Sequence, residues 1–378
     1  MNGNATKQAK SIGTTVRLIR TINDLEQLPK VWEVFGATVN SPIEDLTWIK
    51  ACAQSFQAAG DLQVFVVQQE ERSIALAPLM RSKGLFPHLI MLGVKKIYEP
   101  MDFLYTDDAV VEVLVNELSK LRSPLFLERI PANSPVIPAI QKIYQGKGWV
   151  NVTPVAPYPY LMLDASWTEP ETQFNSGRRS DFRRAQRNAE KLGEVRYEIL
   201  SPTEAEIEPL LQEAYQTELK SWKGANGSAL AVNQAQGNFF HQYGRIASQR
   251  GILRLCFLRI NGEAVAMQIA VEYANRFWLL KVGYNENFAR CSPGNLLMLH
   301  TVKYAATQGL ASYEFLGCAE PWIQLWTQSL RQCVAVAAYP ASVSAVMTLI
   351  FDQLWQRIKN INSLSILKTR LKQVLRRQ

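Results

Sequence analysis

A short loop, Arg290–Asn295, is the best candidate for a phosphate-binding element in this sequence. It reads Arg-Cys-Ser-Pro-Gly-Asn and leads into a helix predicted over 294–308. A loop that delivers a glycine to a helix N-terminus presents backbone N–H groups and the positive end of the helix dipole, which suit a pyrophosphate. Pro293 removes one of these donors, and an ordinary Ser-Pro-Gly helix start has the same sequence. The residues that we expect to bind the phosphates are Arg290, Ser292, Gly294 and Asn295.

Two glutamates near the next predicted strand are candidates for a general base. Glu314 lies near the end of a strand predicted over 312–316, and Glu320 follows it. A carboxylate can accept a proton from an amine, directly or through water. Tyr284 closes the preceding strand and can donate a proton to a leaving group. Each also has a structural interpretation: a solvated strand residue for Glu314, an acid at a helix N-terminus for Glu320, and a packing aromatic for Tyr284.

A second substrate needs its own contacts, and four residues are candidates for them. Trp222 and Lys223 end a predicted helix, Asp102 lies in a loop of the first half, and Arg183 lies on a basic helix. Each has a structural alternative. Trp222 and Lys223 can be a core tryptophan and a lysine of the last helical turn. Asp102 can cap a turn, and Arg183 can lie on a solvated helix face. The three histidines are far apart and the five cysteines are scattered, so no metal site is predicted. Such cysteines are typical of reduced thiols in a reducing, cytoplasmic compartment.

The elements that must position these residues follow from hydrophobic periodicity. In the second half we predict a helix over 176–192, a strand over 195–200, helices over 203–222 and 238–250, strands over 252–260, 263–273 and 276–284, a helix over 294–308, a strand over 312–316, a helix over 321–329 and a strand over 333–339. Asn261-Gly262 predicts a two-residue hairpin between the first two strands of this three-strand meander.

The first half is predicted to be a looser version of the same layout. It contains strands at 16–22, 62–68, 73–80, 89–92 and 125–130, helices at 24–35, 45–56, 110–121 and 139–148, and an extended proline-rich stretch at 152–160. The chain is 378 residues long with 47% hydrophobic and 20% charged residues, which excludes a disordered chain and favours two domains. We place these domains at 16–165 and 166–342, after a disordered stretch, 1–15, that lacks the apolar region of a signal peptide.

The net charge of +8 is unevenly distributed. Residues 343–378 hold seven basic and one acidic side chain, whereas residues 1–165 are neutral. The segment 343–378 has apolar residues at helical spacing, so it is predicted to be a basic amphipathic helix that packs on its own domain or lies on an anionic leaflet. Residues 334–351 are uncharged, but Pro340 divides this run into a strand and a helix, which argues against a membrane span.

A second basic feature is a stripe on the helix predicted over 176–192. Arg179, Arg183, Arg187 and Lys191 recur every four residues and therefore share one face. Downstream, residues 198–218 hold six glutamates and no basic residue. Three interpretations of the stripe are open. It pairs with these glutamates within the chain, it binds phosphates of a cofactor or of a nucleotide-linked acceptor, or it contacts tRNA. A uniformly basic nucleic-acid-binding surface is not predicted.

The element order of the second half is that of the GNAT acyltransferase fold, and several blocks resemble the CelD-like (cellulose-biosynthesis-type) acetyltransferases. These blocks are Ser176–Arg187, Gly283-Tyr284, Ser292–Gly294 and Tyr313–Gly317 with Glu320 and Trp326, and, upstream, Trp32, Ser41-Pro42, Trp48 and Pro78-Leu79. That family is similar in turn to the FemAB aminoacyl transferases, which pair two GNAT-like domains. The resemblance covers roughly residues 16–340.

The resemblance implies an α/β (α+β) protein of tandem GNAT-like folds with mixed, largely antiparallel sheets, whose second domain is catalytic. It implies acetyl-CoA or another acyl-CoA as co-substrate, with its pyrophosphate at the 290–295 loop, and an amine of a small molecule, sugar or cell-envelope precursor as acceptor. The sequence departs from the pattern at Pro293, where the GNAT phosphate motif has its first glycine. It also has Pro321-Trp322 where relatives often have a lysine.

Two other functions fit the same resemblance. One is FemAB-like transfer of an aminoacyl group from tRNA. The other is a degenerate, non-catalytic GNAT pair that acts as a scaffold for envelope polysaccharide synthesis, with peripheral contact to the inner membrane face through the basic tail.

Overall fold

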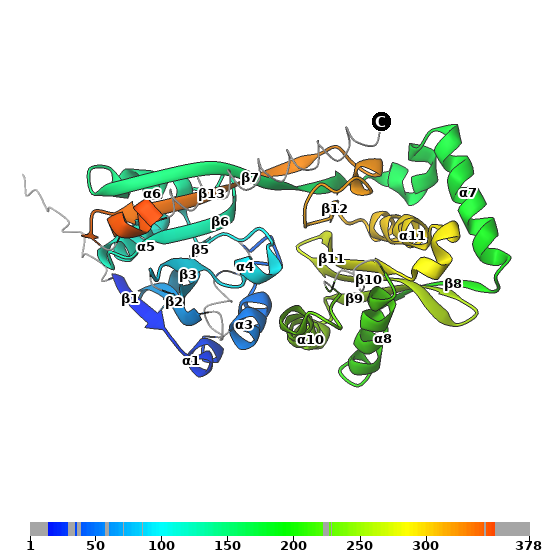
Figure 1. Cartoon of the computed structure of the whole chain (residues 1–378), viewed down its shortest axis with the longest axis horizontal. Helices are drawn as coiled ribbons and strands as arrows, with labels where there is room; N and C mark the ends of the chain where they lie inside the picture. The colour runs from blue at the N-terminus through cyan, green and yellow to red at the C-terminus, as the bar shows by residue number, and fades with distance from the viewer. Residues whose placement is uncertain are drawn as a thin grey trace, which may run out of the picture.

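The computed structural model describes residues 14–28, 35, 39–56, 60–70, 72–84, 86–221, 227, 229–343 and 345–351. In this part of the chain, one long mixed sheet runs through two halves, with helices packed against it (Figure 1). The predicted α/β class is therefore confirmed.

The first half contains most of the elements predicted for it. In chain order they are β1 (Thr14–Ile19), α1 (Ile22–Glu26), α3 (Leu46–Ser55), β2 (Gly60–Gln69), β3 (Arg72–Ser82), β4 (Leu89–Met91), α4 (Val94–Ile97), β5 (Leu104–Tyr105), α5 (Asp108–Lys120), β6 (Leu125–Pro131), α6 (Val136–Tyr144) and β7 (Gly148–Met162). The helix predicted over 139–148 starts earlier and ends at Tyr144, because Gly146 has a φ of +70° and Gly148 already begins β7.

The second half follows the predicted order closely. It contains the short 3-10 helices η2 (Ala165–Thr168) and η3 (Pro170–Gln173), then α7 (Ser176–Glu190), β8 (Val195–Leu200), α8 (Ile207–Leu219), α10 (Gln234–Gln249), β9 (Leu253–Ile260), β10 (Glu263–Tyr273), β11 (Arg276–Tyr284), η4 (Glu286–Cys291), α11 (Pro293–Thr307), β12 (Ser312–Glu314), η5 (Ile323–Leu325) and β13 (Leu330–Pro340). The strand predicted over 312–316 is only three residues long. The helix predicted over 321–329 is only the single 3-10 turn η5.

The sheet order is β1-β2-β3-β4-β6-β13-β7-β12-β11-β10-β9-β8, and β5 pairs with β3. The last strand, β13, lies between β6 and β7, so residues 330–340 complete the sheet of the first half, although we predicted them as part of the second domain. The proline-rich stretch 152–160 lies inside the long strand β7, whose end at Tyr160–Met162 pairs with β12. β7 and β13 therefore tie the two halves together.

The two halves also contact each other through helices α3 and α10, which lie side by side (Figure 1). Trp48 of α3 packs edge-on against Phe239 and Tyr243 of α10, with ring centroids 4.7 and 5.1 Å apart. Asp45, the N-cap of α3, forms an ion pair with Arg250 at the end of α10. These contacts hold the first half against the second.

The cysteines and the C-terminal segment bear on two further predictions. Cys52, Cys256, Cys291 and Cys333 are buried free thiols, as predicted, but Cys318 is exposed. Beyond β13, residues 343 and 345–351 are helical, and the rest of the predicted basic tail lies outside the described residues. Among the residues that are described, no helix has the length and apolar character that crossing a membrane requires.

Candidate active site

The candidate site lies where two neighbouring strands of the second half separate. β11 and β12 pair in parallel only through Arg276–Trp278 and Ser312–Glu314. Past this pairing, the segments Leu279–Tyr284 and Phe315–Cys318 line a cavity of about 580 Å³, together with Ile97–Glu99 from the first half. The volume is that of a pocket for a small-molecule ligand.

A β-bulge in β11 lies in the cavity wall. Ile269 of β10 pairs with Lys281 and its neighbour Ala270 pairs with Leu279, so Leu280 is an extra residue on β11. A bulge bends its strand and increases the local twist, and bulges are common beside active sites. Here the bend comes immediately after β11 stops pairing with β12, and it accompanies the opening between the two strands.

Glu99 contributes a largely buried carboxylate to the cavity from the first half, and the sequence analysis did not select it. Its side chain is 11% exposed, and Oε2 accepts a hydrogen bond of 3.1 Å from the Gly317 N–H. Burial raises the pKa of Glu99 to about 7, although the Arg129 guanidinium, the Gly317 N–H and the Lys281 ammonium oppose this rise. A carboxylate that titrates near neutral pH inside a cavity is suited to general acid–base chemistry.

Arg129 holds the Glu99 loop in place. Its side chain is fully buried and lies 3.7 Å from the Glu99 carboxylate. Nη1 donates to the Tyr98 carbonyl and Nη2 donates to the Gly317 carbonyl at 2.6 Å, so one guanidinium joins the two walls of the cavity. The guanidinium also lies over the Tyr98 ring, 4.8 Å from its centroid. Arg129 thereby fixes the position of Glu99 relative to the chain after β12.

The predicted phosphate loop also lines the cavity, and we call this part of the wall its phosphate end. Ser292, Gly294 and Asn295 line it, as does Pro293, the first residue of α11. Ser292 has a φ of +45°, and its carbonyl already accepts hydrogen bonds from the N–H groups of Asn295 and Leu296. Because proline has no N–H, the first turn of α11 leaves at most the N–H of Gly294 for an anion.

Of the other predicted residues of this region, two line the cavity and one does not. Tyr284 and Glu320 line the cavity, and Glu320 accepts a hydrogen bond of 2.7 Å from the Trp322 indole N–H. Arg290 is exposed on η4 and does not line the cavity, while its carbonyl accepts a hydrogen bond of 3.3 Å from Asn188 of α7.

Glu314 is not brought to the cavity. Its side chain is fully buried on β12, where both carboxylate oxygens accept hydrogen bonds from Arg331 at 2.7 and 3.0 Å. Ser312 also donates to it at 2.7 Å, and Arg276 lies 4.0 Å away. A carboxylate that is enclosed by two arginines has no contact with a substrate in the cavity. This placement favours a structural role for Glu314.

The four predicted acceptor-side residues are also not brought together. Asp102 is buried in its own loop, accepts a hydrogen bond of 2.8 Å from the Phe103 N–H, and has a pKa raised to about 6 by burial. It does not line the cavity, and Arg183 is exposed on α7. Trp222 and Lys223 lie outside the described residues.

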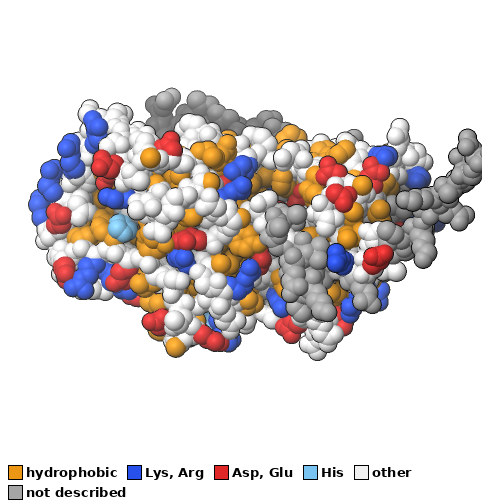
Figure 2. All heavy atoms as spheres, turned by 180° about the vertical axis from the view of Figure 1, so that it is seen from behind, with side chains coloured by type: hydrophobic (Ala, Val, Ile, Leu, Met, Phe, Trp, Pro, Cys, Tyr) orange, Lys and Arg blue, Asp and Glu red, His pale blue; other side chains and the backbone are white. Residues whose placement is uncertain are grey.

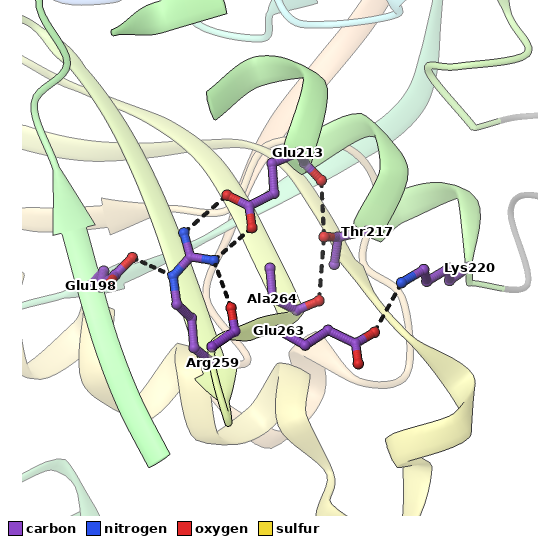
Figure 3. Close-up of polar contacts among 8 residues, drawn as sticks. Glu198, Glu213, Thr217, Lys220, Arg259, Glu263 and Ala264 are labelled. Carbon is purple, nitrogen blue, oxygen red and sulfur yellow. Dashed lines mark hydrogen bonds and ion pairs between the residues drawn. The ribbon is translucent and has the colours of Figure 1, made fainter. Parts of the chain in front are cut away.

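Helix α8 supports the cavity from behind β11. Arg259 of β9 donates to Glu198 of β8 at 2.7 Å and to both carboxylate oxygens of Glu213 of α8 at 2.6 and 2.9 Å (Figure 3). This network anchors α8 on the sheet, so that Glu218 packs against Gly283 of β11. A Cβ atom at Gly283 would lie 2.8 Å from the Glu218 Cα, so the close approach requires glycine.

Residues 176–323 match the sequence model of a family described as "Acetyltransferase (GNAT) domain". The matched segment includes the bulged strand, the loop that precedes α11 and the chain that follows β12. The similarity to this GNAT family is thus confined to residues 176–323. The prediction of an acyltransferase enzyme with a GNAT-like fold is thereby confirmed. No curated protein matches the chain.

Solved structures resemble the chain over nearly its whole length. FemX is 9% identical and has a TM-score of 0.56, over 86% of this chain and 97% of FemX. The C-terminal domain of a putative lysylphosphatidylglycerol synthetase from Agrobacterium fabrum is 9% identical with a TM-score of 0.54, over 87% and 95%. A conserved protein of unknown function from Bacteroides thetaiotaomicron is 13% identical with a TM-score of 0.52, over 85% and 99%. At these identities the likeness concerns the fold alone.

Proposed function

We propose that this GNAT domain transfers an acetyl or other acyl group from an acyl-CoA thioester to an amine, with Glu99 as the general base. One observation carries the proposal. A buried carboxylate with a pKa of about 7 faces the same cavity as the N-terminus of α11, and this cavity lies between the two diverging strands β11 and β12. The cavity thus offers both a phosphate end and a base.

The donor would lie with its phosphate at Ser292, Gly294 and Asn295 and with its thioester between β11 and the segment Phe315–Cys318. The helix dipole and the hydroxyl and amide side chains favour a phosphate there. In this pose the thioester carbonyl lies along the bulged part of β11, whose backbone can polarise it. The supporting observations are the cavity lining and the bulge at Leu280.

The chemical step needs a neutral amine and an aligned carbonyl. The amine nitrogen attacks the thioester carbonyl carbon, the carbon–sulfur bond breaks, and an amide and a free thiol result. The proton that the amine loses passes to the Glu99 carboxylate, directly or through one water. The departing thiolate takes a proton from Tyr284, which lines the cavity beside Gly294. Glu320, at the same cavity, is the alternative base.

The acceptor would enter from the side of the first half, where Tyr98 and Glu99 close the cavity. We propose an amine on a small molecule, a sugar or a cell-envelope precursor, in line with the resemblance to CelD-like acetyltransferases. A second candidate donor is aminoacyl-tRNA. It is favoured by the likeness to FemX and by the exposed cations of α7.

Donor binding can be tested by calorimetry with acetyl-CoA. Asn295 is the third residue of α11, so Asn295→Glu puts a negative charge at the proposed phosphate position, while an acid at this point of a helix keeps or slightly raises stability. We expect Asn295→Glu to abolish acetyl-CoA binding. The control Asn295→Gln, which has the shape of glutamate without its charge, should retain binding. Equal binding by wild type and Asn295→Glu would contradict the proposed donor site.

A further inference from the structure

Helix α7 presents a row of cations to solvent. Arg179, Arg183, Arg187 and Lys191 are all exposed, whereas Phe182, Ala185 and Ala189 on the other face of the helix are buried. We call the four cations the α7 basic row. In Figure 2, which is turned by 180° from Figure 1, blue side chains run along the upper left edge, where α7 lies.

The α7 basic row is not neutralised within the described part of the chain. None of its four side chains makes an ion pair or hydrogen bond there. Their neighbours Arg178 and Arg184 both pair with Asp181. The acidic segment 198–218, a predicted partner of the row, bonds elsewhere, as in the pairing of Glu213 with Arg259 and of Glu208 with His241. The row is therefore available for an external anionic partner.

The α7 basic row lies beside the phosphate end of the cavity. Asn188, between Arg187 and Lys191 on the helix, donates a hydrogen bond of 3.3 Å to the carbonyl of Arg290 in η4. η4 leads directly into Ser292, which lines the cavity. A partner that docks on the row therefore has the cavity within reach.

The phosphate end fits one phosphate group better than a pyrophosphate. Pro293 has no N–H, and the N–H groups of Asn295 and Leu296 already bond to the Ser292 carbonyl. One amide at most, from Gly294, remains in the first helical turn. Free CoA brings a pyrophosphate and a further phosphate, whereas a phosphopantetheine arm attached to a protein brings a single phosphodiester. Because only one backbone N–H remains for a phosphate, the site favours a phosphopantetheine arm that is attached to a protein.

From this juxtaposition we propose that the α7 basic row docks an acidic carrier protein, which delivers the acyl thioester to the cavity on a phosphopantetheine arm. The proposal rests on the proposed function, because it keeps the same cavity, base and acceptor and replaces free CoA by a carrier protein as the group that bears the thioester. The row spans about 18 Å along the helix axis, about the length of one short helix on a small partner. The remaining basic excess of residues 1–342 is small, since the net charge of this segment is +2. A tRNA would be expected to use a wider basic surface.

The test measures the affinity of the full chain for an acidic acyl carrier protein in its apo, holo and acetylated forms. The variant Arg183→Ala/Arg187→Ala/Lys191→Ala removes three charges of the row, and the control Lys120→Ala/Lys142→Ala/Lys147→Ala removes three exposed charges of the first half. We expect the first variant to raise Kd for all carrier forms about 10-fold or more, with a salt-dependent wild-type affinity, and the control to leave it within about twofold. The holo and acetylated forms should bind more tightly than the apo form.

Three results would overturn the inference, and they can be told apart. Unchanged carrier affinity in the row variant, with normal acetyl-CoA binding, would reject the docking surface and leave the proposed function standing. Failure of both acetyl-CoA and the phosphopantetheine arm to engage the cavity would reject the proposed function as well. Row-dependent binding of tRNA or of vesicles containing anionic phospholipid, without carrier binding, would assign the row to a different polyanion.

Discussion

Replacing Glu99 by glutamine removes the proposed base while it keeps the shape of the side chain. If Glu99 accepts the proton of the amine, Glu99→Gln should lower kcat/KM by about 10²–10⁴. The fold should persist, because the Gly317 N–H can still donate to the side-chain oxygen at this position. Glu320→Gln, at the same cavity, is the matched control and should retain most of the activity.

The pH dependence of the reaction follows from the pKa of Glu99. Burial raises this pKa from 4.5 to about 7, a shift that corresponds to about 3 kcal/mol between the two protonation states. The base acts in its ionised form, so with an acceptor amine that stays neutral over this range kcat/KM should rise with pH up to about 7 and level off above it. Activity should fall to about one tenth at pH 6 and about one hundredth at pH 5. A glutamate of ordinary pKa would keep its activity to near pH 4.5.

The assay is the initial rate of thiol release from acetyl-CoA with a panel of amine acceptors, over a buffer series from acid to alkaline pH. Arg129→Lys is an informative second variant, because weaker contact with the cation should move the acidic limb to higher pH. Full activity of Glu99→Gln, or a loss found in Glu320→Gln instead, would refute the assignment of the base.

Stability offers a second measurement that needs no acceptor. A folded-state pKa above the unfolded value contributes stability below pH 4.5, and this contribution is lost as pH rises through about 7. Glu99→Gln does not titrate. The stability of the variant relative to wild type should therefore increase by up to about 3 kcal/mol between pH 4.5 and pH 8, as measured by denaturant unfolding. A constant difference over this range would contradict the raised pKa.

Three further predictions test the supports of the site. Gly283→Ala should lower the free energy of unfolding by about 1–3 kcal/mol, because its Cβ meets Glu218 at 2.8–3.0 Å; an unchanged Tm would contradict this close packing. Glu314→Gln should lower the free energy of unfolding by about 3 kcal/mol, because it leaves Arg331 without its anionic partner. Its activity should fall only as much as the amount of folded protein falls. A fully folded, inactive variant would restore Glu314 as a candidate base. If the basic tail contacts an anionic membrane, removal of residues 352–378 should abolish pelleting with anionic vesicles. Unchanged pelleting would exclude the tail as the membrane contact.

Much of the second half could be predicted because its signals are local. Asn261-Gly262 forms the expected hairpin, with φ values of +50° and +83° at its two residues. Pro293 opens α11 as the sequence indicates, since proline suits the first position of a helix. The loop from Ser292 to Asn295 therefore lies at a helix N-terminus and lines the cavity, as expected.

The residues that complete the cavity could not be found in this way. Glu99 lies far in the sequence from the segment that matches the GNAT model, and its pKa depends on burial that arises only when Gly317 and Arg129 fold around it. Glu314 looked like an accessible strand residue, but it is buried because β7 and β13 bring Arg331 beside it. Alternation along a strand does not say which strand will pair with it.

Turn chemistry and apolar periodicity act over a few residues, so the sequence itself predicts local features. These are the order of the elements, the mixed α/β class and the helix N-terminus that lines the cavity. Contacts between distant segments decide three other features. They place β13 in the sheet of the first half, they separate β11 from β12, and they bring Glu99, and not Glu314, to the cavity. Desolvation and ion pairing act through space, so the character of each carboxylate was set by its neighbours in the folded chain.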